Sequence, residues 1–349
     1  MTLTDIKSRK PEDLRREFEA MAFPGYRADQ LFQWLHQKHV QHFEEMTNLP
    51  KALRAQLAAV YRIPKVEIAG RYPSNLDETV KYLFRMEDGA LAEGVLMRYR
   101  HGDSICISTQ LGCKMGCDFC ATGKTGFSRN LLASELLGQI QQVHRETGRR
   151  ISNVVLMGMG EPLDNYQEVL RFLSLVSHEK GLGIGMRHIS LSTCGIVDKI
   201  YDLADRGFQL TLSVSLHASN DEIRRRIMPV ARKWDLKQLL KACRYYSDKT
   251  KRRISFEYAM IRGVNDGLAC ARELGGRLRG ILAHINLIPM NQIEETAYEQ
   301  SPRQQIRQFA GVLEGMGFSV TVRRTLGSDI DASCGQLRRR EKEVQIHES

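Results

Sequence analysis

The sequence has few features of membrane or secreted proteins. No apolar run among its 349 residues is long enough to span a bilayer, and its first residues lack an apolar segment followed by a cleavage site. We therefore expect a cytoplasmic protein with no membrane partner. Its eight cysteines are few for so long a chain, and three of them are clustered. This pattern favours thiols that act as ligands or reactants in a reducing compartment over a disulfide framework.

Hydrophobic residues, by contrast, make up 42% of the chain, which is enough for one large core and a smaller accessory domain. The formal net charge is +10, and the sequence pI is near 9.2. An excess of Lys and Arg favours polyanionic partners, because each phosphate contact releases counterions. Many cytosolic enzymes are also basic, so charge alone does not identify the partner.

Cys113, Cys117 and Cys120 form the most informative pattern, CxxxCxxC, with Phe119 before the last cysteine. Thiolates are the usual ligands of iron–sulfur clusters. Three of them on one loop would hold a four-iron cube and leave one iron open to a small molecule. A zinc knuckle is the alternative, but zinc sites normally add a nearby second pair of Cys or His ligands. No second pair follows here, so the spacing favours an iron–sulfur cluster.

Strand and helix patterns alternate from about residue 104 onward, as expected for a parallel sheet covered by helices. Between the strands lie amphipathic stretches such as 134–145, where Leu136, Ile140 and Val143 share one face. Six strand–helix units predict a partial α/β barrel, whose active site lies at the carboxyl ends of the strands. The cysteine loop directly follows the first strand. The predicted strands are 104–109, 154–157, 188–192, 210–215, 254–260 and 285–288, with a further strand at 318–323.

The amino-terminal part has a different pattern, with amphipathic stretches at 11–21, 27–39 and 51–61. We expect a helical accessory domain over 1–74, a β-hairpin extension over 75–103 and the barrel over 104–349. The hairpin strands are expected at 79–86 and 91–99. His36, His39 and His42 fan around a helix, a spacing that predicts solvated or RNA-facing side chains and not a metal site.

Several separated motifs then agree in order with one family. The sequence resembles the RlmN/Cfr family of radical S-adenosylmethionine (SAM) RNA methyltransferases, and the match to the RlmN branch covers nearly the whole chain. The motifs are ICISTQLGCKMGCDFCATGKTGF, LMGMGEPLDN, LSTCG, SVSLHA, LIPMN and DIDASCGQL, which begin at residues 105, 156, 191, 213, 287 and 329. The resemblance implies a partial (β/α)6 radical SAM barrel with a small amino-terminal helical domain.

The same resemblance implies a cofactor site. The three clustered cysteines would bind a [4Fe–4S] cluster whose open iron takes SAM. Taken singly, Gly160 could merely shape a turn, and Ser192 or Ser215 could satisfy backbone groups at a strand end. Their joint occurrence at successive strand ends favours a binding role. The SAM contacts implied by the resemblance are Phe119, Gly160, Glu161, Ser192, Ser215, Leu216, His217 and Asn291.

The resemblance further implies a reaction that uses two SAM molecules per turnover. Cys334 takes a methyl group from the first, and the second yields the radical that activates this methyl for addition to C2 of an adenine. Glu93 would accept the C2 proton, and Cys106 would release the RNA by forming a disulfide with Cys334. From the residues alone, Cys106 could instead be a packed core thiol and Glu93 an exposed hairpin carboxylate. Cys194, Cys243 and Cys270 match no reactive position and are expected to be structural.

The implied substrates are an adenosine of 23S rRNA and one in certain tRNAs, and the implied electron donor is a low-potential carrier such as flavodoxin. A monomer is expected. A Cfr-type C8 methyltransferase is the near alternative, and a non-catalytic, metal-bound RNA-binding protein is the distant one. The resemblance implies that the helical accessory domain over 1–74 binds RNA. Clustered cations that could also contact RNA lie at 224–226, 251–253, 323–324 and 338–340. The last two are favoured because they bracket Cys334.

Overall fold

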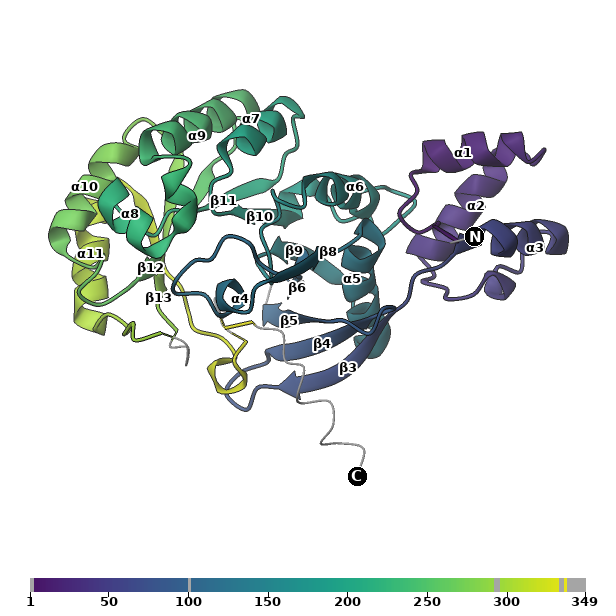
Figure 1. Ribbon diagram of the computed structural model, residues 1–349, viewed down its shortest axis with the longest axis horizontal. Helices are drawn as coiled ribbons and strands as arrows, with labels where there is room; N and C mark the ends of the chain where they lie inside the picture. The colour runs from purple at the N-terminus through teal and green to yellow at the C-terminus, as the bar shows by residue number, and fades with distance from the viewer. Residues whose placement is uncertain (1–2, 100–101, 292–295, 333–335, 338–349) are drawn as a thin grey trace.

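The computed structural model describes residues 3–99, 102–291, 296–332 and 336–337, and its centre is one ten-stranded sheet (Figure 1). Seven of these strands run parallel and pair in chain order. Each overlaps a strand predicted from the sequence. They are β6 (Gly102–Cys106), β9 (Ile151–Leu156), β10 (Ile189–Thr193), β11 (Thr211–Ser215), β12 (Ile254–Met260), β13 (Ala283–Pro289) and β14 (Ser319–Val322).

A helix follows each of the first six parallel strands, which confirms the predicted partial barrel of six strand–helix units. In the helix that follows β6, α5 (Ala133–Thr147), Leu136, Ile140 and Val143 are fully buried, as their position on one helical face predicts. Shorter helical segments are α8 (Asp221–Ile227), η2 (Met186–His188) and η3 (Pro229–Arg232). The six covering helices are α5 (Ala133–Thr147), α6 (Tyr166–Val176), α7 (Val197–Asp205), α9 (Leu236–Thr250), α10 (Leu268–Leu278) and α11 (Arg303–Gly315).

An antiparallel extension continues the sheet beyond β6. The hairpin β4 (Val80–Met86) and β5 (Leu91–Tyr99) is found where the sequence predicts it, and β5 pairs with β6. A third strand, β3 (Val66–Pro73), pairs with β4 at the sheet edge. The sequence predicts this segment as part of the helical domain, but the structure places it in the sheet. Seven of its eight residues are half-buried or exposed and its pairing shifts register after Ile68, so its apolar alternation is too weak to reveal a strand.

The amino-terminal helices α1 (Pro11–Ala20), α2 (Tyr26–His36) and α3 (Lys51–Val60) match the three predicted amphipathic stretches. A 3-10 turn, η1 (Phe43–Glu45), and a two-stranded sheet of β1 (Thr4–Asp5) and β2 (Tyr61–Arg62) complete this unit. Their apolar side chains belong to the same core cluster as the barrel helices. The hydroxyl of Ser134, in the first turn of α5, donates to Asp5 Oδ2 at 2.6 Å. The helical unit is therefore docked onto α5.

His36 and His39 lie at this junction and are buried, so their expected solvated or RNA-facing placement is wrong. Only His42 of the three is exposed. The His36 ring centroid lies 4.3 Å from that of Phe32, and the His39 ring meets His144 of α5 edge-on at 5.1 Å. The physical reason is that His36 shares the inward apolar face of α2 with Phe32.

The cysteine loop extends from the carboxyl side of the barrel between two short strands, β7 (Gln110–Gly112) and β8 (Phe127–Asn130), and contains the short helix α4 (Ala121–Lys124). Gly112 has a φ of +79°, and a Cβ there would lie 1.8 Å from the carbonyl oxygen of Gly126. Only glycine fits at the base of this loop. None of the helices in the described part of the chain is long and apolar enough to cross a membrane.

Candidate active site

A cavity of about 170 Å³ opens at the carboxyl ends of the parallel strands. The three clustered cysteines and seven of the eight SAM contacts implied by the resemblance line it. The exception is Leu216, which is buried and whose backbone N–H donates to the Glu257 carbonyl at 3.0 Å. The lining residues from this set are Cys113, Cys117, Phe119, Cys120, Gly160, Glu161, Ser192, Ser215, His217 and Asn291.

The three cysteine side chains of the loop are partly buried. Burial raises the pKa of the Cys113 thiol to about 12 and raises that of Cys117 well above its usual value. Such thiols ionise only when a cation holds them, so this donor set fits a cluster with thiolate ligands. Within the described residues, no three Cys, His, Asp or Glu side chains are grouped as a single metal ion would require.

Gly160 and Glu161 form the turn after β9. Gly160 has a φ of +100°, and a Cβ there would lie 2.6 Å from the Cβ of Gln110. The Glu161 carboxylate accepts from the backbone N–H groups of Cys194 at 2.7 Å and Leu163 at 3.0 Å. Burial raises the pKa of Glu161 despite these bonds. The Glu161 side chain therefore ties the β9 turn to the loop after β10, beside the cavity.

Ser192, Ser215 and His217 come from the next two strand ends. The two serine hydroxyls lie 3.5 Å apart. His217 has a φ of +55°, and its Nδ1 accepts from the backbone N–H of Ala259 at 2.9 Å. Burial lowers the pKa of His217 to about 3, so the ring is neutral and carries its proton on Nε2. The Phe119 ring packs edge-on against His217, with centroids 4.8 Å apart.

Two lining residues were missed or discounted by the sequence analysis. Glu257 on β12 is buried, and its carboxylate accepts from Ser255 Oγ at 2.8 Å and Asn286 Nδ2 at 2.6 Å. The sequence signal that could have identified Glu257 was a single Glu inside an otherwise apolar strand. Cys194, expected to be structural, is buried and also lines the cavity, and burial raises the pKa of its thiol well above the usual value.

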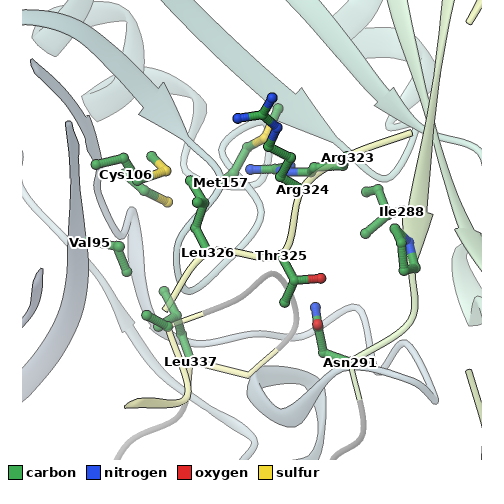
Figure 2. A pocket seen from close by; sticks show the side chains of 13 residues that line it. Val95, Cys106, Met157, Ile288, Asn291, Arg323, Arg324, Thr325, Leu326 and Leu337 are labelled. Atoms are coloured by element: carbon green, nitrogen blue, oxygen red, sulfur yellow. The ribbon is translucent and has the colours of Figure 1, made fainter. Parts of the chain in front are cut away.

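A smaller cavity of about 40 Å³ adjoins the first and contains Cys106 (Figure 2). Met157, Ile288, Asn291 and Arg323 line both cavities. Cys334 lies outside the described residues, but Ala332 and Leu337 on either side of it line this second cavity with Cys106. Figure 2 shows Cys106 facing Leu326 and Leu337 across the space. The chain segment that carries Cys334 therefore begins and ends beside Cys106.

The segment before Cys334 is anchored to the antiparallel extension. Asp329, in η4 (Ser328–Ile330), accepts from Ser74 Oγ and from the Asn75 backbone N–H, both at 2.7 Å. The Gly327 N–H donates to Asp77 Oδ2 at 3.0 Å. On the other side, the Thr122 hydroxyl donates to the Leu337 carbonyl. Both flanks of Cys334 are thus fixed to elements that surround the cavities.

Glu93 is buried on β5, with 3% of its surface exposed, so the alternative of an exposed hairpin carboxylate is wrong. Its Oε1 lies 3.6 Å from Nζ of Lys81 on β4, which is also buried. The Ser108 hydroxyl donates to the Glu93 backbone carbonyl at 2.6 Å. Two residues further along β5, Val95 pairs with Cys106 and lines its cavity. A buried, cation-paired carboxylate therefore lies close to the Cys106 cavity.

The four basic clusters have different surroundings. Arg224 is fully buried, which removes it from the candidate RNA contacts, whereas Arg225 and Arg226 are exposed. Residues 251–253 precede β12, at the opposite end of the sheet from the cavities. Arg323 and Arg324 line the Cys106 cavity, and residues 338–340 lie outside the described residues.

Comparisons with known proteins agree with this architecture. Residues 107–269 match the model of the radical SAM superfamily, and residues 4–63 match that of the ribosomal RNA large subunit methyltransferase N-terminal domain. A crystal structure of a radical SAM methyltransferase from Sphaerobacter thermophilus is 40% identical. It superposes with a TM-score of 0.90 over 96% of this chain and 99% of that chain.

Curated relatives extend the match to nearly full length. A protein of Clostridium botulinum (strain Eklund 17B / Type B), named "Probable dual-specificity RNA methyltransferase RlmN", is 54% identical over 90% of both chains. A Lachnoclostridium phytofermentans protein of the same name is 50% identical over 96% of this chain and 94% of the relative. These identities extend across both the helical unit and the barrel. The chain belongs to the RlmN family of radical SAM RNA methyltransferases.

Proposed function

We propose that the protein methylates C2 of an adenosine in 23S rRNA and of an adenosine in certain tRNAs. The observation that carries this proposal is the pair of adjoining cavities. One contains the cysteine loop and the predicted SAM contacts, and the other contains Cys106 and both flanks of Cys334. Methyl transfer to an aromatic C–H carbon needs a protein-borne methyl group next to a source of hydrogen abstraction. Because the two cavities share a wall, a methyl group on Cys334 would lie next to the SAM that provides the hydrogen abstraction.

In this proposal Cys113, Cys117 and Cys120 hold the [4Fe–4S] cluster that the family implies. When bound, the cluster and SAM supply the hydrogen abstraction that activates a methyl group. The protein's own residues orient SAM at the strand ends. The neutral His217 ring presents its Nε2 proton as a donor, and Ser192 and Ser215 offer hydroxyls. Phe119, held by His217, provides an aromatic face for the adenine.

Cys334 is proposed to accept the methyl group at Sγ from one SAM, with a second SAM consumed in each turnover. In this proposal, loss of a hydrogen atom from the Cys334 methyl would leave a carbon radical that adds to C2 and links the protein covalently to RNA. Loss of the C2 proton and of one electron, which the oxidised cluster would accept, would leave a closed-shell adduct. Cys106 would then form a sulfur–sulfur bond with Cys334 as the carbon–sulfur bond to the RNA breaks, and the released carbon would take up a proton to become the C2 methyl group. Cys106 is buried and lines the cavity that both flanks of Cys334 line, which supports its role in that step. The resulting disulfide must be reduced before the next turnover.

Glu93 is proposed to accept the proton that leaves C2. Its burial next to the Cys106 cavity supports this role, since a base must lie within reach of the reacting carbon. Nζ of Lys81, 3.6 Å from Glu93 Oε1, is a basic group beside this carboxylate.

Arg323, Arg324 and residues 338–340 are proposed to contact RNA phosphates around the reacting base. Arg323 and Arg324 line the cavity wall in Figure 2, and clustered cations bind phosphates without reading sequence. The adenine must leave its stack to enter such a cavity. We further propose that the protein acts as a monomer and takes electrons from a low-potential carrier such as flavodoxin.

The test is to digest 23S rRNA and tRNA from a deletion strain and identify the methyladenosine isomer that is lost. Loss of 2-methyladenosine from both RNAs, restored by the wild-type gene, is the expected result. Loss of 8-methyladenosine instead would assign the protein to Cfr-type chemistry. Retention of every methyladenosine would contradict the proposed activity altogether.

A second experiment tests the metal site. Anaerobic reconstitution should give about four irons per chain, as a single cubane requires. Replacing Cys113, Cys117 and Cys120 together with Ala should abolish iron binding. Zinc in anaerobically purified protein, with no redox-active iron obtainable, would contradict the assignment.

A further inference from the structure

Arg224 on α8 is a buried cation beside the cysteine loop. It is fully inaccessible to solvent, although Arg225 and Arg226 next to it are exposed. Its side chain points inward because it lies three residues before Ile227, which is also fully buried. An isolated buried charge costs several kcal/mol or more unless an opposite charge compensates it. The position of Arg224 therefore needs an explanation beyond packing.

The hydrogen bonds of Arg224 join the two strand ends that form the cavity. Its Nη2 donates to the Cys194 carbonyl after β10 at 2.6 Å and to the Ser215 carbonyl of β11 at 3.4 Å. Its Nε donates to the Leu216 carbonyl at 3.2 Å. These acceptors are all neutral, so they orient the guanidinium without neutralising it. Among the described residues, buried Nη1 has no hydrogen-bond partner.

Arg224 lies beside the predicted cluster ligands. Cys194 and Ser215, whose carbonyls accept from Arg224, line the same cavity as Cys113, Cys117 and Cys120. The carbonyl of Ile227, three residues along α8, accepts from the backbone N–H of Asp118 in the cysteine loop at 2.9 Å. Cys117 packs against a buried cluster that contains Cys194 and Ile227. An arginine stays protonated in proteins, so a positive charge is buried next to the loop that would hold the cluster.

We propose that Arg224 is a positioning residue whose buried charge stabilises the reduced form of the iron–sulfur cluster, while its hydrogen bonds hold the two strand ends against it. Reduction adds one negative charge to a site already rich in thiolate. A cation in a low-dielectric interior makes that addition less costly and raises the reduction potential. The inference rests on the proposed cluster ligands Cys113, Cys117 and Cys120.

The experiment compares the midpoint potential of the cluster in wild type, Arg224→Gln and Arg224→Lys, measured by anaerobic redox titration with electron paramagnetic resonance detection. Gln removes the charge but keeps an amide that can donate to a carbonyl, and Lys keeps the charge. Arg225→Gln is the matched control, since it removes an exposed charge from the adjacent position of the same helix. Iron content of each variant is determined first.

For Arg224→Gln we expect at least a tenfold lower ratio of reduced to oxidised cluster at a fixed potential, equivalent to 59 mV for a one-electron couple. Arg224→Lys should recover most of this difference, and Arg225→Gln should match wild type. An unchanged potential in Arg224→Gln would overturn the proposal. Loss of iron from both the Gln and Lys variants would also overturn it, because the role would then be structural. Failure of wild type to bind iron would refute the proposed cluster instead.

Discussion

The buried histidines between α2 and α5 predict that the amino-terminal helical unit loses stability in mild acid. Burial, together with the charges of His144 and Lys7, lowers the pKa of His39 from 6.5 to about 4. Burial also lowers the pKa of His36 well below its usual value, reinforced by Lys7, His39 and His178. Both rings are therefore neutral in the folded protein at neutral pH.

The direction of this pH dependence follows from the number of protons that the folded and unfolded chains bind. Because the folded pKa of His39 is lowered, the unfolded chain binds more protons between pH 6.5 and 4, so stability is complete above pH 6.5 and falls as the pH drops. For His39 alone, these two pKa values give a loss of about 2 kcal/mol at pH 5 and about 3 kcal/mol at pH 4. His36, whose pKa is also lowered, adds a further loss of stability as the pH falls.

The assay is urea unfolding at pH 8 and pH 5, followed by the fluorescence of Trp34 on α2 in a Trp234→Phe background, since the chain has two tryptophans. His39→Asn removes the titrating ring. It also suits the backbone, since φ is +55° there and Asn tolerates that region. The pH-dependent loss should shrink by about 2 kcal/mol in this variant and stay unchanged in His42→Asn, where the ring is exposed. Equal pH dependence in His39→Asn and wild type would refute the reasoning.

Two further predictions concern the cavities. Gly160→Ala should weaken SAM binding at least tenfold in equilibrium dialysis, because its Cβ would collide with Gln110. Gly183→Ala, also at a positive φ but in open space, should bind SAM normally, and equal affinities in the two variants would contradict the argument. Lys81→Gln should accumulate covalent protein–RNA adduct during turnover, because its ammonium lies 3.6 Å from the Glu93 carboxylate. Lys81→Arg should relieve this block, whereas adduct at wild-type levels in Lys81→Gln would exclude a role for Lys81 in proton removal.

Much of the barrel could be predicted because its strands are short apolar runs and its covering helices have one clear apolar face. Ser192 and Ser215, which the family resemblance implied and the strand-end rule favoured as ligand contacts, line the same cavity. The edge strand β3 could not be predicted, because all but one of its residues are half-buried or exposed and carry little periodic signal.

The burial of individual polar residues was the other feature that could not be predicted from the sequence. The run of three arginines at 224–226 has the composition of a solvated face, and only the spacing of Arg224 to Ile227 hints that one side chain points inward. Glu257 and His36 were missed for the same reason. Their burial depends on which partners surround them in three dimensions, and this information is absent from local spacing.

The most direct test of the proposed reaction is the fate of RNA bound to the Cys106→Ala protein. Cys334 forms the bond to the base and Cys106 only breaks it, so Cys106→Ala should retain RNA covalently on a denaturing gel, and nuclease should trim that RNA away. The Cys106→Ala/Cys334→Ala double variant should carry none. Normal turnover by Cys106→Ala without a trapped adduct would contradict the proposed release step and make Cys106 a packed core thiol.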